Sequence, residues 1–363
     1  MVNTLLVGLA VLWVICSPRV LWKFLQKKVF VFDEKSHGSQ EGFATLCRFL
    51  TQKQGFELLA PLVWGNGHHL NACLFKHPSS KLVFNFHMGR NNSMLSCVSF
   101  VRVFSQFGSV FVCEPPGFGE SPGEADFLSF GNCGILSHRT LVQMGYSNDQ
   151  IIPCGDSLGA AAATAEAVWA GSRALIISAA FESMVRMARE QMPILRIYPE
   201  WMFPSHTRLS NLENLRRFKG ITLLLHGVHD ELIPISHALA LKAVAPARTI
   251  LTELDAAHRD TAGSDPDTYK TAVEGFLRVW LSPSDIGLSS HPNGTADGAA
   301  ASRVSDGDGS EPGLSLIVNP KPRPNRGKRG GLFGSHGLRL VVDGGKPVDS
   351  PHGGKSGKPS NDR

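Results

Sequence analysis

The chain has 363 residues, of which 42% are hydrophobic, and its formal net charge is +5. This length suits one large domain with a substantial core, and so modest a charge gives no reason to expect a nucleic-acid-binding protein. The seven cysteines are scattered, odd in number and without a CxxC pair, which favours a reducing compartment over a secreted disulfide framework. Cysteine and histidine are not spaced as metal ligands, and we expect neither a metal nor another cofactor.

An apolar run over residues 4–16 lies near the start of the chain. Basic residues follow it: Arg19, Lys23, Lys27 and Lys28. A cleaved signal peptide would carry basic residues before the run and a small-residue cleavage site after it, and this start has neither. A helix over residues 2–20 would just suffice for one membrane span, and the positive-inside rule then places the rest of the chain in the cytoplasm. We therefore predict a membrane anchor over residues 1–30; a buried or surface-lying hydrophobic helix is the alternative.

The middle of the chain, residues 31–281, alternates short apolar runs with helical patterns. Residues 56–64 and 71–75 are extended runs around Gly65-Asn66-Gly67, a hairpin signal. We expect further strands at residues 81–86, 109–113, 151–154, 174–178, 221–226 and 249–254. We expect helices at residues 93–106, 126–144, 157–170, 236–244 and 267–281. A hairpin followed by repeated strand and helix predicts an α/β fold with a mainly parallel sheet covered by helices on both faces.

Two segments depart from this alternation. Residues 181–218 are irregular and rich in Met and Pro, and we predict a small lid-like insert or acyl pocket there, with ordinary helix core as the alternative. Residues 282–363 are dominated by Gly, Pro, Ser, Asp and Lys, a composition typical of a disordered tail. Its basic run over residues 321–329 would suit anionic lipid or nucleic acid, but we interpret it as a solvated tail.

The sequence Gly155-Asp156-Ser157-Leu158-Gly159 matches the GxSxG pattern where an expected strand meets an expected helix. Such a turn exposes the serine hydroxyl above the sheet, and its glycines let the strand and the helix pass closely. Ser157 is therefore the candidate nucleophile. The pattern is short, and its meaning depends on a base, an orienting acid and an oxyanion site elsewhere in the chain.

Two residues after later strands supply the base and the acid. Asp230 follows the strand over 221–226 and His258 follows the strand over 249–254, at the edge where ligands bind in parallel sheets. The chain order Ser157, Asp230, His258 is that of the α/β-hydrolase arrangement, with His258 as general base and Asp230 as its orienting acid. Glu231 is the alternative acid.

An oxyanion site needs two backbone donors. Leu158, directly after the nucleophile, supplies one, and Met88, in the loop after the strand over 81–86, supplies the other. The Gly-rich loop over 114–121 lacks the lysine of a P-loop and leads into acidic residues, so we interpret it as a tight active-site loop and not as a phosphate site.

From residue 56 to 281 the chain resembles the serine α/β-hydrolases, most closely their membrane-anchored, bud-emergence-type branch. The matching segments are residues 86–92, 116–121, 155–159, 230–234 and 258–261. Two departures are Met88, where the family usually has Gly, and Glu114, where Asp is usual. The resemblance implies the α/β-hydrolase fold and an esterase-like activity. Residues 155–158 also spell the GDSL signature of another hydrolase family, but several strands precede Ser157 and no GxND block follows it.

We therefore expect a serine hydrolase that cleaves a carboxylic ester or thioester, on a small-molecule or lipid-like acyl substrate, through an acyl-Ser157 intermediate. The alternatives are a non-catalytic interaction protein with the same fold and a peptidase-type serine hydrolase. The sequence carries no signal for an oligomeric state.

Overall fold

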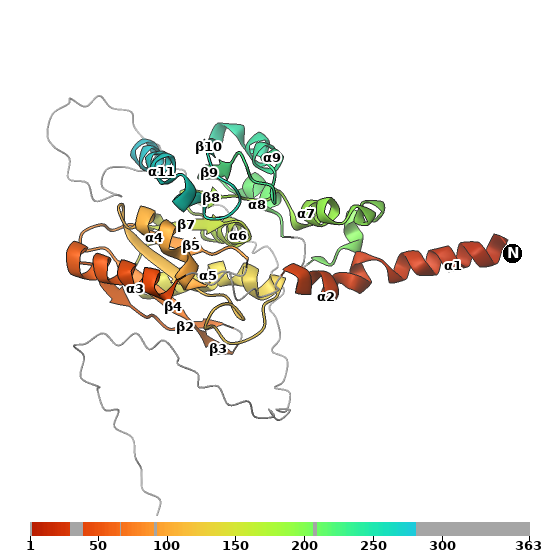
Figure 1. Ribbon diagram of the computed structural model, residues 1–363, viewed down its shortest axis with the longest axis horizontal. Coiled ribbons are helices and arrows are strands. Elements are labelled where there is room, and N and C mark those ends of the chain that lie inside the picture. The colour runs from red at the N-terminus through yellow and green to blue at the C-terminus, as the bar shows by residue number, and fades with distance from the viewer. Residues whose placement is uncertain (1, 30–38, 66, 91–92, 206–208, 281–363) are drawn as a thin grey trace, which may run out of the picture. The chain divides into compact units, whose positions relative to one another are not determined.

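Eight strands form one sheet in the order β1-β4-β6-β5-β7-β8-β9-β10 (Figure 1). The structure is a computed structural model, and it describes residues 2–29, 39–65, 67–90, 93–205 and 209–280. The strands are β1 (Glu57–Leu59), β4 (Ala72–Lys76), β5 (Val83–His87), β6 (Ser109–Cys113), β7 (Ile151–Asp156), β8 (Ala174–Ser178), β9 (Ile221–Gly227) and β10 (Thr249–Leu254). Every neighbouring pair from β6 to β10 is parallel, and β4 runs antiparallel to both of its neighbours. The predicted mainly parallel sheet is confirmed.

The chain reverses near the predicted hairpin turn, but the strands that pair across it are shorter than predicted and form a separate two-stranded sheet. The strands of this small sheet are β2 (Val63–Gly65) and β3 (His68–Leu70), which pair antiparallel. The second predicted run, residues 71–75, is β4 of the large sheet, where it pairs with β1. The expected single run over residues 56–64 is divided, because β1 ends at Leu59 and Pro61 lies before β2. Proline has no N–H to donate to a strand ladder, which accounts for the break.

Helices cover both faces of the sheet, as predicted. One group consists of α3 (Gln40–Arg48), α4 (Val98–Phe104) and α11 (Pro266–Trp280); the other consists of α5 (Phe127–Gln143), α6 (Gly159–Ala170), α8 (Asn211–Arg217) and α9 (Ser236–Val244). Shorter elements are η2 (Phe49–Lys53), η3 (Met94–Cys97), η4 (Asn148–Gln150), η8 (Pro246–Arg248) and α10 (Thr261–Ser264). Alternate residues of β8 pack into opposite clusters: Ile176 lies with the first group and Ile177 with the second. Side chains alternate across a strand, so β8 is buried on both faces.

Between β8 and β9 lies the segment predicted as an insert. It contains α7 (Met184–Gln191), η5 (Pro193–Ile197), η6 (Glu200–Met202) and then α8. Several of its side chains form a small hydrophobic cluster of their own: Val185, Leu195, Tyr198, Met202 and Phe203. The predicted tail, residues 282–363, lies outside the described residues.

The N-terminal segment is two helices, α1 (Val2–Ile15) and α2 (Pro18–Val29). The prediction of one helix over residues 2–20 is wrong. Pro18 occupies the first position of α2, where its missing N–H is tolerated, and α1 does not continue through it. With 14 residues, α1 reaches about 21 Å, against a hydrocarbon core of about 30 Å. None of the helices in the described ranges is both long and apolar enough to cross a membrane.

Candidate active site

Ser157 lies in a strained turn between β7 and α6. Its φ of 55° is in the left-handed region, which non-glycine residues seldom adopt and which is typical of functional turns. The glycines on either side are required by close approach. A Cβ on Gly155 would overlap the carbonyl oxygen of Gly159, and a Cβ on Gly159 would overlap the carbonyl oxygen of His87. The strand therefore delivers Ser157 to a tight turn directly before the helix.

The structure brings Ser157, His258 and Asp230 together in one hydrogen-bonded chain. His258 Nε2 lies 3.0 Å from Ser157 Oγ, and His258 Nδ1 lies 2.8 Å from Asp230 Oδ2. Because an ionised carboxylate only accepts, Nδ1 carries the proton and donates to Asp230. Nε2 then keeps a lone pair that can accept the hydroxyl proton of Ser157. The imidazole is 17% exposed whereas the Asp230 carboxylate is fully buried, so only the histidine side is accessible.

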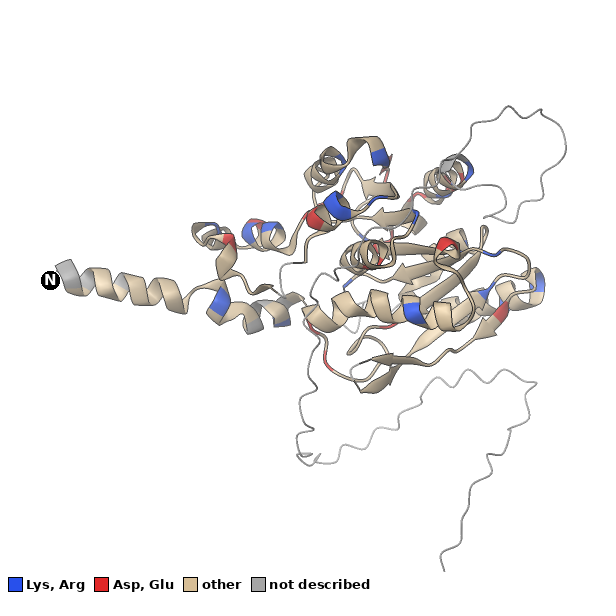
Figure 2. Ribbon diagram, turned by 180° about the vertical axis from the view of Figure 1, so that it is seen from behind, with Lys and Arg blue, Asp and Glu red and all other residues tan. Residues whose placement is uncertain are grey.

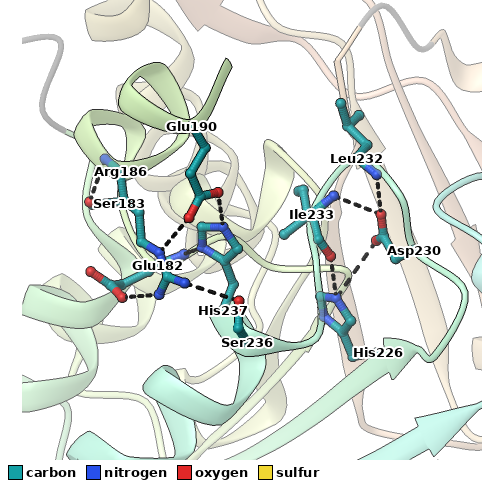
Figure 3. A network of polar contacts seen from close by, with 10 residues as sticks. All are labelled: Glu182, Ser183, Arg186, Glu190, His226, Asp230, Leu232, Ile233, Ser236 and His237. Carbon is teal, nitrogen blue, oxygen red and sulfur yellow. Dashed lines mark hydrogen bonds and ion pairs between the residues drawn. The ribbon is translucent and has the colours of Figure 1, made fainter. Parts of the chain in front are cut away.

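Backbone donors fix the orientation of Asp230 (Figure 3). Its Oδ1 accepts from the N–H groups of Leu232 at 3.0 Å and Ile233 at 2.7 Å, which leaves Oδ2 for His258. The buried His226 Nε2 donates to the Ile233 carbonyl at 2.7 Å and lies 3.7 Å from Asp230 Oδ2. Burial lowers the pKa of His226, which keeps that ring neutral at physiological pH.

The alternative acid, Glu231, is exposed, and it is the Asp230 carboxylate that contacts His258. Asp230 is buried, and the N–H groups of Leu232 and Ile233 hold its carboxylate in the orientation that reaches His258. The sequence analysis had named Asp230 as the acid and left Glu231 open as the alternative.

The two predicted oxyanion donors lie next to the turn. Leu158 directly precedes α6, and Met88 directly follows β5, whose last residue abuts Gly159. Neither the Met88 N–H nor the Leu158 N–H donates a hydrogen bond to another described residue. Unpaired buried N–H groups are rare in proteins, so these two are suited to receive an acceptor from a substrate.

Asp156, the residue before Ser157 in the motif, has a buried carboxylate with a perturbed pKa. Its Oδ1 accepts from Ser178 Oγ at 2.9 Å. Burial raises the pKa of Asp156 to about 6, against the opposing effects of nearby His258 and of the Ser178 hydrogen bond. A single hydroxyl donor does not replace the hydration that this carboxylate loses. The sequence placed this residue in the turn but did not indicate that its side chain is buried.

Glu114 has a structural role that the sequence did not indicate. Its buried carboxylate accepts from the Met94 N–H at 2.7 Å, the Asn71 amide at 2.8 Å and the Glu120 N–H at 2.7 Å. Burial raises its pKa, although these three hydrogen bonds oppose the increase. Glu114 thereby ties together three loops at the edge of the sheet that carries Ser157. This arrangement requires glycine at position 119, because a Cβ there would overlap the Glu114 carboxylate.

Hydrogen bonds link the insert to α9 (Figure 3). Glu190 accepts from the buried His237 at 2.8 Å, and Arg186 donates to Ser236 Oγ at 3.0 Å. Within the insert, Arg186 on α7 pairs with Glu182 at 2.5 Å and with Glu190 at 2.8 Å. Beside α7 lies an open cavity of about 750 Å³, lined by residues 182–200 of the insert and by neither Ser157 nor His258. The cavity belongs to the insert and not to the edge of the sheet that carries Ser157. Among the described residues, no cluster of three or more Asp, Glu, His or Cys side chains is arranged to hold a metal ion.

Comparison with solved structures identifies the architecture. The esterase Pf2001 of Pyrococcus furiosus superimposes with a TM-score of 0.54 over 64% of this chain and 94% of that one, at 16% identity. The chain has an α/β-hydrolase fold. Est1E of Butyrivibrio proteoclasticus, in a structure with bound ferulic acid, gives 0.50 over 61% of this chain and 99% of that one, at 16% identity.

The acylaminoacyl peptidase of Pyrococcus horikoshii also shares this fold, with a TM-score of 0.51 and 14% identity. The match covers 64% of this chain and 43% of the peptidase. No family model matches the chain, and no curated protein matches its sequence. The resemblance to the bud-emergence-type branch therefore stays a prediction.

Proposed function

We propose that the protein is a serine hydrolase that cleaves a carboxylic ester or thioester through an acyl-Ser157 intermediate. The observation that carries this proposal is the chain Ser157 Oγ, His258 and Asp230, with both hydrogen bonds at 3.0 Å or less. A hydroxyl beside an imidazole whose other nitrogen is held by a buried carboxylate is the arrangement that activates serine for acyl transfer.

In the first half-reaction, Ser157 Oγ attacks the acyl carbon while His258 Nε2 takes the hydroxyl proton. Asp230 stabilises the imidazolium that forms. The carbonyl oxygen becomes an oxyanion, which the Met88 and Leu158 N–H groups stabilise. His258 then gives its proton to the leaving alcohol or thiol, and the acyl group stays on Ser157.

In the second half-reaction, water attacks the acyl carbon while His258 removes its proton. The bond to Ser157 Oγ breaks, and His258 returns the proton to the serine. The carboxylic acid leaves and the resting state is restored.

Ester chemistry is preferred over amide chemistry on the grounds of similarity. Two of the similar structures are of esterases and match almost their whole length, whereas the peptidase is matched over less than half of its chain. Peptide hydrolysis by the same three residues is the second candidate, and the chromogenic anilide of an acylated amino acid tests it beside an acyl ester.

A fluorophosphonate probe tests the serine assignment. We expect purified protein to be labelled, and Ser157→Ala and His258→Ala to lose the label. Ser79→Ala is the matched control, because Ser79 is exposed and takes no part in the chain to His258. Wild-type protein that does not react, or Ser157→Ala that reacts equally, would contradict the proposal and favour a non-catalytic interaction protein.

We also propose that the N-terminal segment holds the enzyme at the cytoplasmic face of a membrane. Helix α1 carries no charged residue (Figure 2), and many of its apolar side chains are at least half exposed: Leu6, Val7, Val11, Leu12, Val14 and Ile15. Helix α2, which follows, has basic residues and no acidic one. An apolar helix beside basic residues suits an anionic bilayer surface, and a lipid-like acyl substrate would then be near.

Sedimentation with vesicles tests this association. We expect binding to phosphatidylcholine vesicles that contain phosphatidylserine, and loss of binding in Val7→Asp. Gln52→Asp makes a comparable change at an exposed position outside α1 and should bind normally. Equal binding by both variants would overturn the anchor, and a C-terminal tag protected from protease in sealed inside-out vesicles would overturn the cytoplasmic assignment.

A further inference from the structure

A fully buried carboxylate lies behind the predicted oxyanion loop. Glu166, on α6, has no exposed surface, and its two oxygens face three donors. His87 Nε2 lies 2.5 Å away, His138 Nδ1 lies 2.8 Å away, and the Asn85 amide nitrogen lies 2.8 Å away. Asn85 and His87 belong to β5 and His138 to α5, so one side chain joins three elements. The residue that follows His87 is Met88.

The charge on this cluster follows from its hydrogen bonds. Nδ1 of His138 faces the Glu166 carboxylate, and Nε2 faces the Asn148 side-chain oxygen at 3.1 Å. Both ring nitrogens must donate, so His138 is an imidazolium. Burial opposes this charge, but the contacts with Glu166 and Asn148 outweigh it and raise the pKa of His138. Burial likewise opposes ionisation of Glu166, yet His138 and His87 together lower its pKa.

The peptide bond between His87 and Met88 is held from two sides. On one side, the His87 carbonyl lies so close to Gly159 that a Cβ there would overlap it. On the other side, the His87 ring donates to Glu166 and is fixed in the interior. The Met88 N–H belongs to this same peptide unit, so the orientation of the N–H depends on both restraints.

We propose that Glu166 is a positioning residue, which aims the Met88 N–H at the oxyanion through its hydrogen bond to His87. This role rests on the proposed function and adds to it a carboxylate that touches neither substrate nor Ser157. Oxyanion donors act only when they lie at hydrogen-bond distance from the developing charge, and loss of one donor costs about 100- to 1000-fold in kcat. Misdirecting a donor without deleting it should cost about 10-fold or more.

The test compares two substitutions on α6. Glu166→Gln removes the charge and presents an amide N–H to the His87 donor. Thr164→Val is the matched control: Thr164 is equally buried, and its hydroxyl donates to Asn211 of α8 at 2.8 Å, away from β5. We expect kcat on an acyl ester to fall about 10-fold or more in Glu166→Gln with KM nearly unchanged, and to stay near the wild-type value in Thr164→Val.

A second readout isolates the oxyanion. A trifluoromethyl ketone forms a tetrahedral adduct with the serine, and its inhibition constant should weaken in Glu166→Gln by the same factor as kcat. If Glu166→Gln does not fold, the pair His87→Gln and His87→Leu carries the test. Glutamine can place an amide donor near the position of His87 Nε2 and should retain most of kcat, whereas leucine should lose it.

Two failures are distinguishable. A wild-type protein that neither hydrolyses acyl esters nor reacts with the fluorophosphonate refutes the proposed function, and with it this role of Glu166. An active wild type whose Glu166→Gln variant, or whose His87→Leu variant, has the kcat and inhibition constant of Thr164→Val refutes the positioning role alone. A rise in KM with unchanged kcat refutes it as well.

Discussion

Four carboxylates are buried in the part of the chain that the structure describes, those of Glu114, Asp156, Glu166 and Asp230. The surroundings of the last three give them different chemistry. Glu166 receives three donors and is held as an anion in the interior. Asp156 receives one hydroxyl, and its pKa rises to about 6. Asp230 accepts from two backbone N–H groups and contacts His258, whose side chain is partly exposed. Burial alone therefore does not fix the charge of a carboxylate, because the donors around it decide whether its pKa is raised or lowered.

Removing the charge of Asp230 should have the largest effect. We expect Asp230→Asn to lower kcat about 10⁴-fold, because the amide no longer holds the His258 tautomer that accepts from Ser157. Ester hydrolysis by purified protein measures this. Glu231→Gln makes the same chemical change one residue later on an exposed side chain and should keep kcat; equal losses in both variants would mean that the acid is wrongly assigned.

Removing Glu166 should have the next largest effect, on stability. Glu166→Ala leaves an unpaired buried imidazolium and should cost about 3–5 kcal/mol in the free energy of unfolding by urea. The pKa of Glu166 is lowered, so its contribution is full above its ordinary value of 4.5 and is lost as pH falls through the folded value. The pKa of His138 is raised, so its contribution is full below 6.5 and is lost as pH rises through the folded value.

The difference between wild type and Glu166→Ala should accordingly be greatest between about pH 4.5 and 6.5. Urea unfolding at several pH values measures it. A difference that does not depend on pH would indicate that packing around the side chain, and not its ion pair with His138, dominates.

Asp156 should respond to pH in the opposite sense. Its folded pKa of about 6 lies above the ordinary 3.8, so ionisation favours the unfolded chain and stability falls as pH rises between these values. Asp156→Asn removes that dependence and should be more stable than wild type at pH 8 by about 2 kcal/mol, with little difference at pH 3. Thermal unfolding at both pH values checks this, with Asp149→Asn as an exposed control.

The smallest effect concerns the strained turn. Ser157→Gly and Ser157→Ala should both be inactive, but the glycine variant should be more stable by about 1 kcal/mol, because only glycine adopts a φ of 55° without cost. Urea midpoints compare the two variants. An alanine variant that is equally stable would show that the turn stores no strain.

Much of the architecture could be predicted because it depends on local patterns. Apolar runs and turn residues placed the strands of the sheet, and the small residues around Ser157 indicated the tight turn. Errors occurred where one residue decided the outcome. Pro18 begins a new helix and ended the expected span at Ile15, and Pro61 divided the first extended run.

The candidate site was predictable only in part. The positions of Ser157, Asp230 and His258 after strands followed from the sequence, because parallel strands bring their carboxyl ends to one edge. The part played by Glu166 was not accessible, since this glutamate lies in an alanine-rich helix and its partners His87 and His138 are 79 and 28 residues away. A short sequence motif cannot indicate contacts between residues so far apart in the chain.

The sequence by itself determined the order of strands and helices and the turn at Ser157, because hydrophobic periodicity and glycine at close contacts act over a few residues. The tertiary structure alone decided between Asp230 and its alternative Glu231 as the partner of His258, and it alone decided which buried carboxylates keep their charge. Those choices depend on donors supplied by segments far apart in the chain, and on how completely water is removed from each group.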